Sequence, residues 1–240
     1  MAGKVAVVTG GGRRLGRTIA LALAAAGYDL LVAYGKSETG ARETAAAARG
    51  LGRRAHVFGA DLAARGECER VAASALGLFG SVDLLVNNAA HFVEESLDEL
   101  SAGTAGTAFR VNVIAPALLS RALASSLADR RGAIVNVGSL GGRLFYRRHA
   151  AYSLSKAALA HLTRGLARRY APDVRVNAVA PGGVRFEEGP AGPSLPPIDR
   201  IPLARHARPD EVAALVLFLA ERARYMTGQT ILLDGGRSLV

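Results

Sequence analysis

Three side chains in the middle of the chain have the types and the spacing of a proton-transfer device. Tyr152 and Lys156 stand four residues apart, and Ser139 precedes the tyrosine by thirteen residues. Residues i and i+4 share one face of a helix, so the lysine ammonium can lie beside the phenol. Ser139 ends an apolar run typical of a strand and can face the same point from a sheet. We interpret the three as an acid–base centre.

This chemistry needs a shifted pKa. A phenol has an ordinary pKa of about 10, and a nearby cation favours the phenolate. Bringing that pKa to about 7 requires roughly 4 kcal/mol of differential stabilisation. We expect Lys156 to supply much of it and a cationic cofactor ring to supply the rest. The Tyr-x-x-x-Lys pair alone is weak evidence, because an amphipathic helix with a solvated lysine can carry it by chance.

A glycine-rich stretch near the N-terminus predicts a phosphate site. The residues Thr9-Gly-Gly-Gly-Arg-Arg-Leu-Gly16 join a strand pattern to a helix pattern. Glycines let the backbone approach a pyrophosphate closely, and a helix N-terminus favours the anion. Two arginines add positive charge at the same corner. The cofactor contacts expected here are Gly10, Arg13, Arg14, Leu15 and Gly16.

The second predicted strand ends without the acidic residue that holds the ribose 2′-hydroxyl in an NAD site. Its end reads Tyr34-Gly-Lys36-Ser37, and Glu38 lies beyond. Arg14, Lys36 and Ser37 could instead hold a 2′-phosphate through charge-assisted hydrogen bonds. We therefore expect NADP(H) as the cofactor.

Polar residues also follow the third and fourth predicted strands. Asp61 can accept a hydrogen bond from an adenine amino group or cap the following helix, and Asn88 can fix the loop beneath the cofactor. Asn112 lies inside an apolar helix pattern, where a buried amide needs partners. It is either a structural staple or part of a water relay near Lys156. Further cofactor contacts are expected from Tyr34, Leu62, Ala89, Ala90, Pro181, Gly182 and Val184.

These residues require a scaffold of alternating strands and helices. Strand patterns lie at 5–9, 30–34, 55–59, 84–87, 133–137, 174–179 and 230–233. Helical patterns lie between them at 15–26, 39–49, 67–78, 104–127, 151–170 and 210–220. This alternation predicts an α/β fold with a parallel sheet covered on both faces, in one domain over 1–240. The glycine- and proline-rich segment 182–202 is expected to be a substrate lid, with a slack connection as the alternative.

Composition narrows the function classes. No apolar run is long and clean enough to span a bilayer, and the N-terminus lacks the pattern of a signal peptide. The single cysteine, Cys68, allows no intrachain disulfide, so we expect a cytoplasmic protein without a membrane partner. Lysine and arginine exceed acidic residues by 30 to 20, a net charge of +10. The arginines are scattered and not interleaved with aromatics, so we expect a solvated surface and no nucleic-acid or metal partner.

Together these residues resemble the short-chain dehydrogenase/reductase family over nearly the whole chain. The motifs that carry the resemblance are the glycine loop, Asn87-Asn-Ala-Ala90, Asn112, Ser139, Tyr152-x-x-x-Lys156 and Pro181-Gly182. The resemblance implies a Rossmann-type doubly wound sheet of seven parallel strands, commonly in homotetramers. It implies that Tyr152 is the general acid in carbonyl reduction and that Ser139 hydrogen-bonds the substrate oxygen. Lys156 would bind the nicotinamide ribose and lower the tyrosine pKa, and Asn112 would hold a relay water.

Departures from the family pattern suggest a branch. Arg14 occupies the position of the middle glycine of the common loop, which resembles the NADPH-using pteridine-reductase-like members. Phe186 stands where many members place a cofactor-binding threonine, so that contact is lost. Ser139 stands where a true pteridine reductase has an aspartate, which argues against protonation of a pterin ring. Phe92 matches an aromatic residue that stacks on pterin, although ordinary loop packing explains it equally well.

The leading hypothesis is hydride transfer from NADPH to a carbonyl, with substrate contacts from Phe92, Ser139, Tyr152 and Gly183. One alternative substrate is a 3-oxoacyl group on acyl-carrier protein, an acidic partner that could dock near Arg121, Arg147 and Arg148. Another is a pterin or dihydrofolate. A non-catalytic NADP(H)-binding protein would not need the Ser-Tyr-Lys set.

Overall fold

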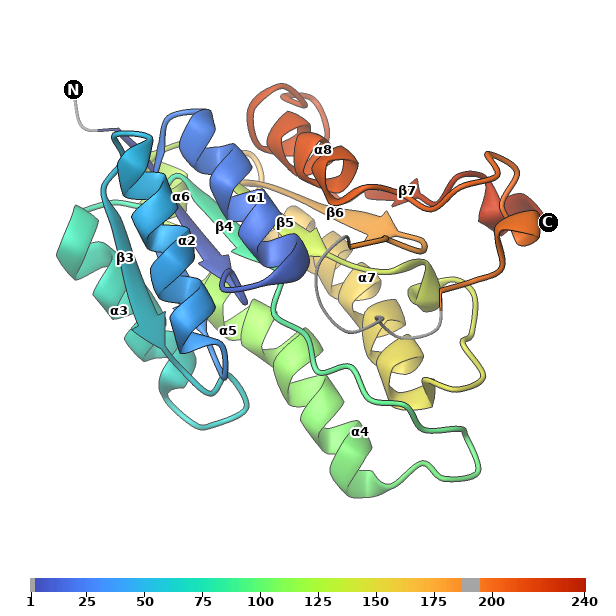
Figure 1. The fold of residues 1–240 in the computed structure, drawn as a ribbon. Helices are drawn as coiled ribbons and strands as arrows, with labels where there is room; N and C mark the ends of the chain where they lie inside the picture. Colours follow the sequence, from blue (N-terminus) through green and yellow to red (C-terminus); the bar gives the residue numbers. More distant parts are fainter. Residues whose placement is uncertain (1–2, 187–194) are drawn as a thin grey trace.

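The computed structural model describes residues 3–186 and 195–240, which form one α/β sandwich (Figure 1). A seven-stranded parallel sheet lies at its centre, in the order β3-β2-β1-β4-β5-β6-β7. The strands are β1 (Lys4–Thr9), β2 (Tyr28–Tyr34), β3 (Ala55–Gly59), β4 (Leu84–Asn87), β5 (Ala133–Val137), β6 (Arg175–Pro181) and β7 (Thr230–Leu233). The expected doubly wound sheet of seven parallel strands is confirmed.

Helices cover both faces of the sheet. One face packs against α1 (Arg14–Ala25), α2 (Glu38–Gly50) and α8 (Pro209–Glu221). The other packs against α3 (Glu67–Phe79), α5 (Ala115–Ala122) and the long α7 (Ala150–Tyr170). Strand β1 shows why its run is apolar throughout: Val7 enters the second core and Val8 the first, and both are fully buried. Two-sided burial is the property that distinguishes a parallel strand from an alternating antiparallel one.

The order of the strands creates the site. Strand β1 lies between β2 and β4. Strands β2 and β3 are added on one side of β1 and β4 to β7 on the other, so the order in which strands are added reverses at β1. In open α/β sheets, ligands bind outside the carboxyl ends of the strands at such a reversal. The glycine loop follows β1, and Asn88 follows β4, so both lie at this edge.

The helix predicted over 104–127 is wrong as a continuous element. It is divided into α4 (Ala102–Phe109), a π-helical turn η1 (Arg110–Ile114), α5 and α6 (Ala124–Asp129). Pro116 has no N–H to offer the carbonyl of Asn112, so the α-helical pattern is interrupted there. Within the turn, the Ala115 N–H donates to the Arg110 carbonyl, one residue further back than in an α-helix.

Short helical turns complete the edge that carries the site: η2 (Leu140–Gly142), η3 (Ile198–Arg200) and η4 (Arg237–Leu239). The expected lid over 182–202 includes residues 187–194, which lie outside the described residues. In the described part of the chain, no helix combines the length and the apolar character needed to cross a membrane.

Candidate active site

The structure brings Ser139, Tyr152 and Lys156 together at the carboxyl edge of the sheet. Ser139 begins η2 directly after β5, and its Oγ accepts a hydrogen bond of 3.0 Å from the Gly141 N–H. Tyr152 and Lys156 occupy the first turns of α7. A Cβ atom at Gly142 would lie 2.8 Å from the Lys156 carbonyl, so η2 packs directly on α7. This close approach places the serine beside the tyrosine.

The Lys156 side chain is only 2% exposed, and its Nζ donates a 2.6 Å hydrogen bond to the Val137 carbonyl at the end of β5. Burial lowers the pKa of Lys156 to about 8. The ammonium lies 5.5 Å from the centroid of the Tyr152 ring. It is therefore held beside the tyrosine by the Val137 carbonyl.

Burial raises the pKa of Tyr152 to about 12, although hydrogen bonding with Ser139 acts in the opposite direction. In the protein without cofactor, desolvation dominates the phenol and the ammonium is engaged with Val137. The expected lowering of this pKa by Lys156 together with a cationic cofactor ring stays a prediction. At neutral pH the phenol holds its proton. It is consequently placed to donate that proton.

Phe92 lies on the surface next to Tyr152 and is 41% exposed. Its ring centroid is 4.6 Å from that of Tyr152 and 4.3 Å from that of His149. His149 is anchored through a 2.8 Å contact between its Nδ1 and the Val93 carbonyl. The rings of Phe92 and His149 therefore pack together beside Tyr152. His149 was not expected at the site from the sequence.

The glycine loop forms a tight cradle between β1, α1 and α2. Gly10 has a φ of +66°, which favours glycine. A Cβ atom at Gly16 would lie 2.1 Å from the Gly10 carbonyl oxygen, and one at Gly12 would lie 2.6 Å from the Ser37 carbonyl oxygen. Helix α1 has no acidic residue in its first turn, and Arg13 makes no side-chain capping hydrogen bond. Its terminal N–H groups suit a pyrophosphate.

The surroundings of this cradle are cationic. Arg13 and Arg14 are exposed at the start of α1, and Lys36 is exposed in the loop after β2. Glu38, the nearest acidic residue in the sequence, pairs with Arg42 one turn along α2. Ser37 is the N-terminal boundary residue of α2. These side chains fit a ribose 2′-phosphate better than a free 2′-hydroxyl.

Asn88 fastens the cradle to β4. Its Nδ2 donates to the carbonyls of Thr9 and Gly10, at 2.9 and 3.2 Å. The backbone N–H groups of Asn88 and Ala89 both donate to the Thr9 hydroxyl at 3.0 Å. Thr9 is thus a supporting residue of the cofactor site that sequence reasoning did not assign.

Asp61 is exposed after β3, where its Oδ1 accepts a 3.0 Å hydrogen bond from the Ala63 N–H. Helix α3 begins only at Glu67, with Gly66 as its boundary residue, so the helix-capping alternative for Asp61 is wrong. The side chain closes a local turn instead. Its predicted contact with adenine stays a prediction.

Asn112 is a structural staple at the centre of η1. Its Oδ1 accepts from the His91 N–H at 2.7 Å, and its Nδ2 donates to the His91 carbonyl and to Ser155 Oγ at 3.0 and 2.9 Å. Both amide hydrogens are used, which ties the loop after β4 to α7. Only a second lone pair on Oδ1 is left for the predicted relay water.

The other predicted contacts lie at the same edge of the sheet. The Gly182 N–H donates to the Leu233 carbonyl at 2.9 Å, and Val184 forms a bridge with Ala207. A Cβ atom at Gly183 would lie 2.9 Å from Pro196. Tyr34, Leu62, Ala90 and Pro181 lie at or directly after the ends of β2, β3, β4 and β6.

Tyr146 lies near Ser139 and Arg237 lies against Tyr146, and neither residue was expected from the sequence. The ring of Tyr146 packs against Gly141, where an added Cβ would lie 2.9 Å from its Cε2 atom. The Arg237 guanidinium lies 5.4 Å from the centroid of the same ring. Tyr146 belongs to an irregular loop, and Arg237 is 91 residues away in the sequence. No local pattern indicates this meeting.

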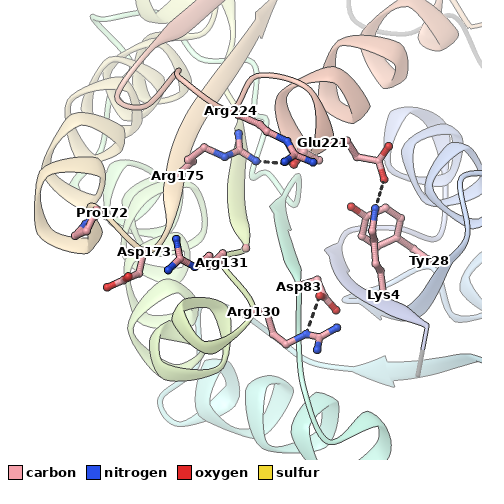
Figure 2. Close-up of a pocket in the computed structure, with 12 residues that line it drawn as sticks. Lys4, Tyr28, Asp83, Arg130, Arg131, Pro172, Asp173, Arg175, Glu221 and Arg224 are labelled. Carbon is pink, nitrogen blue, oxygen red and sulfur yellow. Dashed lines mark hydrogen bonds and ion pairs between the residues drawn. The ribbon is translucent and has the colours of Figure 1, made fainter. Parts of the chain in front are cut away.

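The structure has one hollow beside the candidate site and another on the opposite edge of the sheet. One of about 260 Å³ lies beside Lys156, with Ser139, Arg143 and Arg164 in its lining. Another of about 460 Å³ lies at the opposite, amino edge of the strands (Figure 2). There Lys4 pairs with Glu221 and Arg130 pairs with Asp83, so these four side chains serve as structural ion pairs.

Comparisons with known proteins agree with this geometry. Residues 11–238 match the family model described as enoyl-(acyl carrier protein) reductase. An uncharacterized oxidoreductase of Mycobacterium tuberculosis is 41% identical, over 97% of this chain and 91% of the relative. A short-chain dehydrogenase of Burkholderia cenocepacia, solved in complex with NADP, superposes with a TM-score of 0.92 at 36% identity, over 98% of each chain.

The chain belongs to the short-chain dehydrogenase/reductase family. A 3-oxoacyl-[acyl-carrier-protein] reductase of Synechocystis is also 34% identical, over 97% of this chain and 96% of the relative. The family is thereby confirmed, and the chain is an oxidoreductase. The pteridine-reductase-like branch stays a prediction.

Proposed function

We propose that this short-chain dehydrogenase/reductase uses NADPH to reduce a carbonyl substrate, with Tyr152 as the general acid. The observation that supports it most is the meeting of the Ser139 hydroxyl, the Tyr152 phenol and the Lys156 ammonium next to a glycine cradle. The substrate oxygen would lie between the serine and tyrosine hydroxyls, where both donate to the developing oxyanion. Phe92 and Gly183 would border the rest of the substrate.

NADP(H) is the cofactor that fits these residues. The cradle formed by Gly10, Gly12 and Gly16 would hold the pyrophosphate, and Arg14, Lys36 and Ser37 would hold the 2′-phosphate. The NADP complex of the Burkholderia relative supports this assignment. Bound NADPH would supply the hydride. The protein would orient the carbonyl and deliver the proton.

The source of the proton follows from the pKa values of Tyr152 and Lys156. Tyr152, with a pKa near 12, is protonated at neutral pH and can transfer its proton to the reduced oxygen. Transfer leaves a phenolate, which would be stabilised by the Lys156 ammonium, 5.5 Å from the centroid of the Tyr152 ring. The lysine therefore acts on the product of proton transfer more than on the resting phenol. Asn112 would contribute by keeping the loop after β4 fixed to α7.

The test is NADPH oxidation against acetoacetyl thioesters, dihydropterin, dihydrofolate and quinones. Tyr152→Phe should lower kcat by about 10²–10⁴-fold, the range typical of a lost general acid. The Kd for NADPH should stay within about threefold of the wild-type value. Tyr225→Phe is the matched control, because that phenol is fully exposed. Wild-type turnover in the Tyr152→Phe protein would contradict the mechanism.

A 3-oxoacyl thioester is the second candidate substrate, favoured by the Synechocystis relative. The surface evidence for docking acyl-carrier protein is weaker than the sequence suggested. Arg121 pairs with Glu69, and Arg148 pairs with Glu94, so part of the basic surface is already compensated. A pterin remains the alternative that Phe92 supports, since its exposed ring borders Tyr152.

A homotetrameric assembly and a cytoplasmic location complete the proposal. The first follows from the family resemblance and is tested below. The second would be tested by fractionation of cells that express the chain.

A further inference from the structure

The hollow at the amino edge of the strands has the size of a small-molecule site and lies at the edge opposite the glycine cradle (Figure 2). Its volume is about 460 Å³, and ligand pockets usually measure roughly 300–1,000 Å³. Segments far apart in the sequence meet in its wall, including the turn after α6, the start of β6 and the end of α8. Five of the lining side chains are cations and three are acids.

The charges of this hollow do not balance. Two of the five cations belong to the ion pairs described above, and their partners are two of the three acids. The other cations are Arg131, Arg175 and Arg224, and the remaining acid is Asp173; none of these four forms an ion pair within residues 3–186 and 195–240. Burial raises the pKa of Tyr28, the phenol in the lining, so it adds no charge at neutral pH. Three cations against one acid leave an excess of two positive charges.

Arg175 is held in place at the end of α8. Its guanidinium donates three hydrogen bonds, to the carbonyls of Leu219 and Ala220 at 2.6 Å each and to that of Ala223 at 3.0 Å. A guanidinium has five N–H donors, so two are left over by the contacts of the described residues. Burial lowers the pKa of Arg175, and the nearby charge of Arg224 adds to this effect. An anion beside both guanidiniums would offset the cost of burying this charge.

Arg131 and Arg224 border the same hollow from two other segments. Arg131 follows α6 and Arg224 follows α8, and both are exposed. In the part of the chain that the structure describes, neither guanidinium makes a hydrogen bond, and in Figure 2 the Asp173 carboxylate is turned away from Arg131. The backbone of Arg131 has a φ of +48°, in the left-handed region that favours glycine. A binding role for its guanidinium would account for an arginine at this position.

We propose that this hollow binds a small phosphorylated molecule through Arg131, Arg175 and Arg224. Guanidinium groups bind phosphate oxygens through paired, charge-assisted hydrogen bonds. A phosphate presents oxygens to donors on several sides and carries up to two charges, which matches the excess here, whereas a single carboxylate carries one. The inference is independent of the proposed carbonyl reduction. Because the hollow and the glycine cradle lie at opposite edges of the sheet, both ligands can bind at the same time.

The test is thermal unfolding with increasing pyrophosphate at constant ionic strength. The midpoint of the wild-type protein should rise and saturate, by about 3 °C at roughly ten times the Kd. Arg131→Gln/Arg224→Gln should lose most of this rise. Arg65→Gln/Arg168→Gln is the matched control, because it removes two exposed charges outside the hollow and should keep the rise. Any pyrophosphate in the glycine cradle contributes equally to the three proteins, so the difference between the double variants reports on the hollow.

Calorimetry of the same proteins supplies a second readout. The Kd for pyrophosphate at this site should weaken by at least about tenfold in Arg131→Gln/Arg224→Gln, with the Kd for NADPH within about twofold of the wild-type value. Equal midpoint rises in all three proteins would overturn the proposal, as would equal losses in both double variants or a wild-type rise that never saturates. A larger rise with citrate than with pyrophosphate would overturn the assignment to phosphate.

Discussion

The two ionisable groups of the proposed catalytic centre, Tyr152 and Lys156, have pKa values shifted in opposite directions by the same cause. Burial disfavours charge, so it raises the pKa of Tyr152 to about 12 and lowers that of Lys156 to about 8. Both shifts favour the neutral forms. In the proposed mechanism, Tyr152 would hold its proton until the reduction step, and Lys156 would have to be charged when the phenolate forms.

A pH profile of the reduction follows from these values. Below pH 8, Lys156 carries its charge and Tyr152 carries its proton, so kcat should be nearly constant. As pH rises through about 8, Lys156 loses its proton and kcat should fall. The tyrosine contributes no decline of its own until far higher pH. Steady-state rates from pH 6 to 10 at saturating NADPH check this, and a profile that stays flat to pH 10 would contradict it.

Arg14 combines conformational strain with a predicted role. Its φ of +46° lies in the left-handed region, where a side chain costs about 1–2 kcal/mol. Glycine would relieve this strain but would remove the cation next to the predicted 2′-phosphate. We therefore interpret the strain as retained for cofactor recognition.

Arg14→Gly should accordingly stabilise the protein and weaken its preference for NADPH. We expect the free energy of unfolding to rise by about 0.5–1 kcal/mol, since glycine also gains freedom in the unfolded chain. The ratio of kcat/KM for NADPH to that for NADH should fall by about tenfold. Urea unfolding and parallel assays with the two cofactors measure both effects. A stable variant with an unchanged ratio would show that Arg14 does not contact the phosphate.

At the scale of elements, the contact between the glycine loop and α1 is so tight that it has the least space for an added side-chain atom. A Cβ atom at Gly16 would overlap the Gly10 carbonyl at 2.1 Å. In contrast, Gly165 in α7 has nothing within 4 Å of its added Cβ. The two glycines lie in helices but differ completely in their surroundings.

Gly16→Ala should therefore displace the loop, raise the Kd for NADPH by at least about tenfold and lower the stability by roughly 1–3 kcal/mol. Gly165→Ala, the matched control, should raise the stability by about 0.5–1 kcal/mol, because alanine is the better helix former. Its NADPH affinity should not change. Fluorescence titration and thermal unfolding measure both, and normal NADPH binding by Gly16→Ala would contradict the cradle.

Sequence patterns predicted the strands well for a physical reason. Each strand is a short, two-sided apolar run, such as the buried 5–8 of β1, and this pattern is local. The interruption at η1 was missed because the apolar pattern continues through it, although Pro116 was a visible signal. The polar ends of the strands indicated the cofactor site for the same local reason. Tyr146, Arg237 and the acceptor carbonyl of Val137 could not be found, since their contacts join distant segments.

At the scale of the whole molecule, large apolar side chains remain exposed in several places, and two of these surfaces lie on helical elements: one over η1 and α7, the other over α8. Ile114 on η1 and Leu154 on α7 are 48% and 41% exposed, and Phe218 on α8 is 44% exposed. Closed tetramers commonly have D2 symmetry and use more than one self-complementary patch. These two surfaces are suited to such an assembly.

We expect the protein to sediment at about four times the 24.9 kDa mass of one chain. Phe218→Asp should reduce it to dimers, because a charge on that patch is costly to bury. Light scattering coupled to size-exclusion chromatography measures the masses of the tetramer and the dimer. Glu43→Gln, at an exposed position on α2, is the control. A monomer at micromolar concentration would contradict the expected assembly.

The contact between Arg14 and Phe186 joins two parts of the carboxyl edge of the sheet, the glycine loop after β1 and the segment after β6. The guanidinium lies 5.9 Å from the centroid of that ring. Arg14 belongs to the corner predicted to hold the 2′-phosphate, whereas Phe186 follows β6, whose end is predicted to border the substrate. A phosphate that attracts the Arg14 guanidinium would also change the contact between this guanidinium and the Phe186 ring. On this basis we expect the nucleotide to bind before the substrate, an order that product-inhibition kinetics would test.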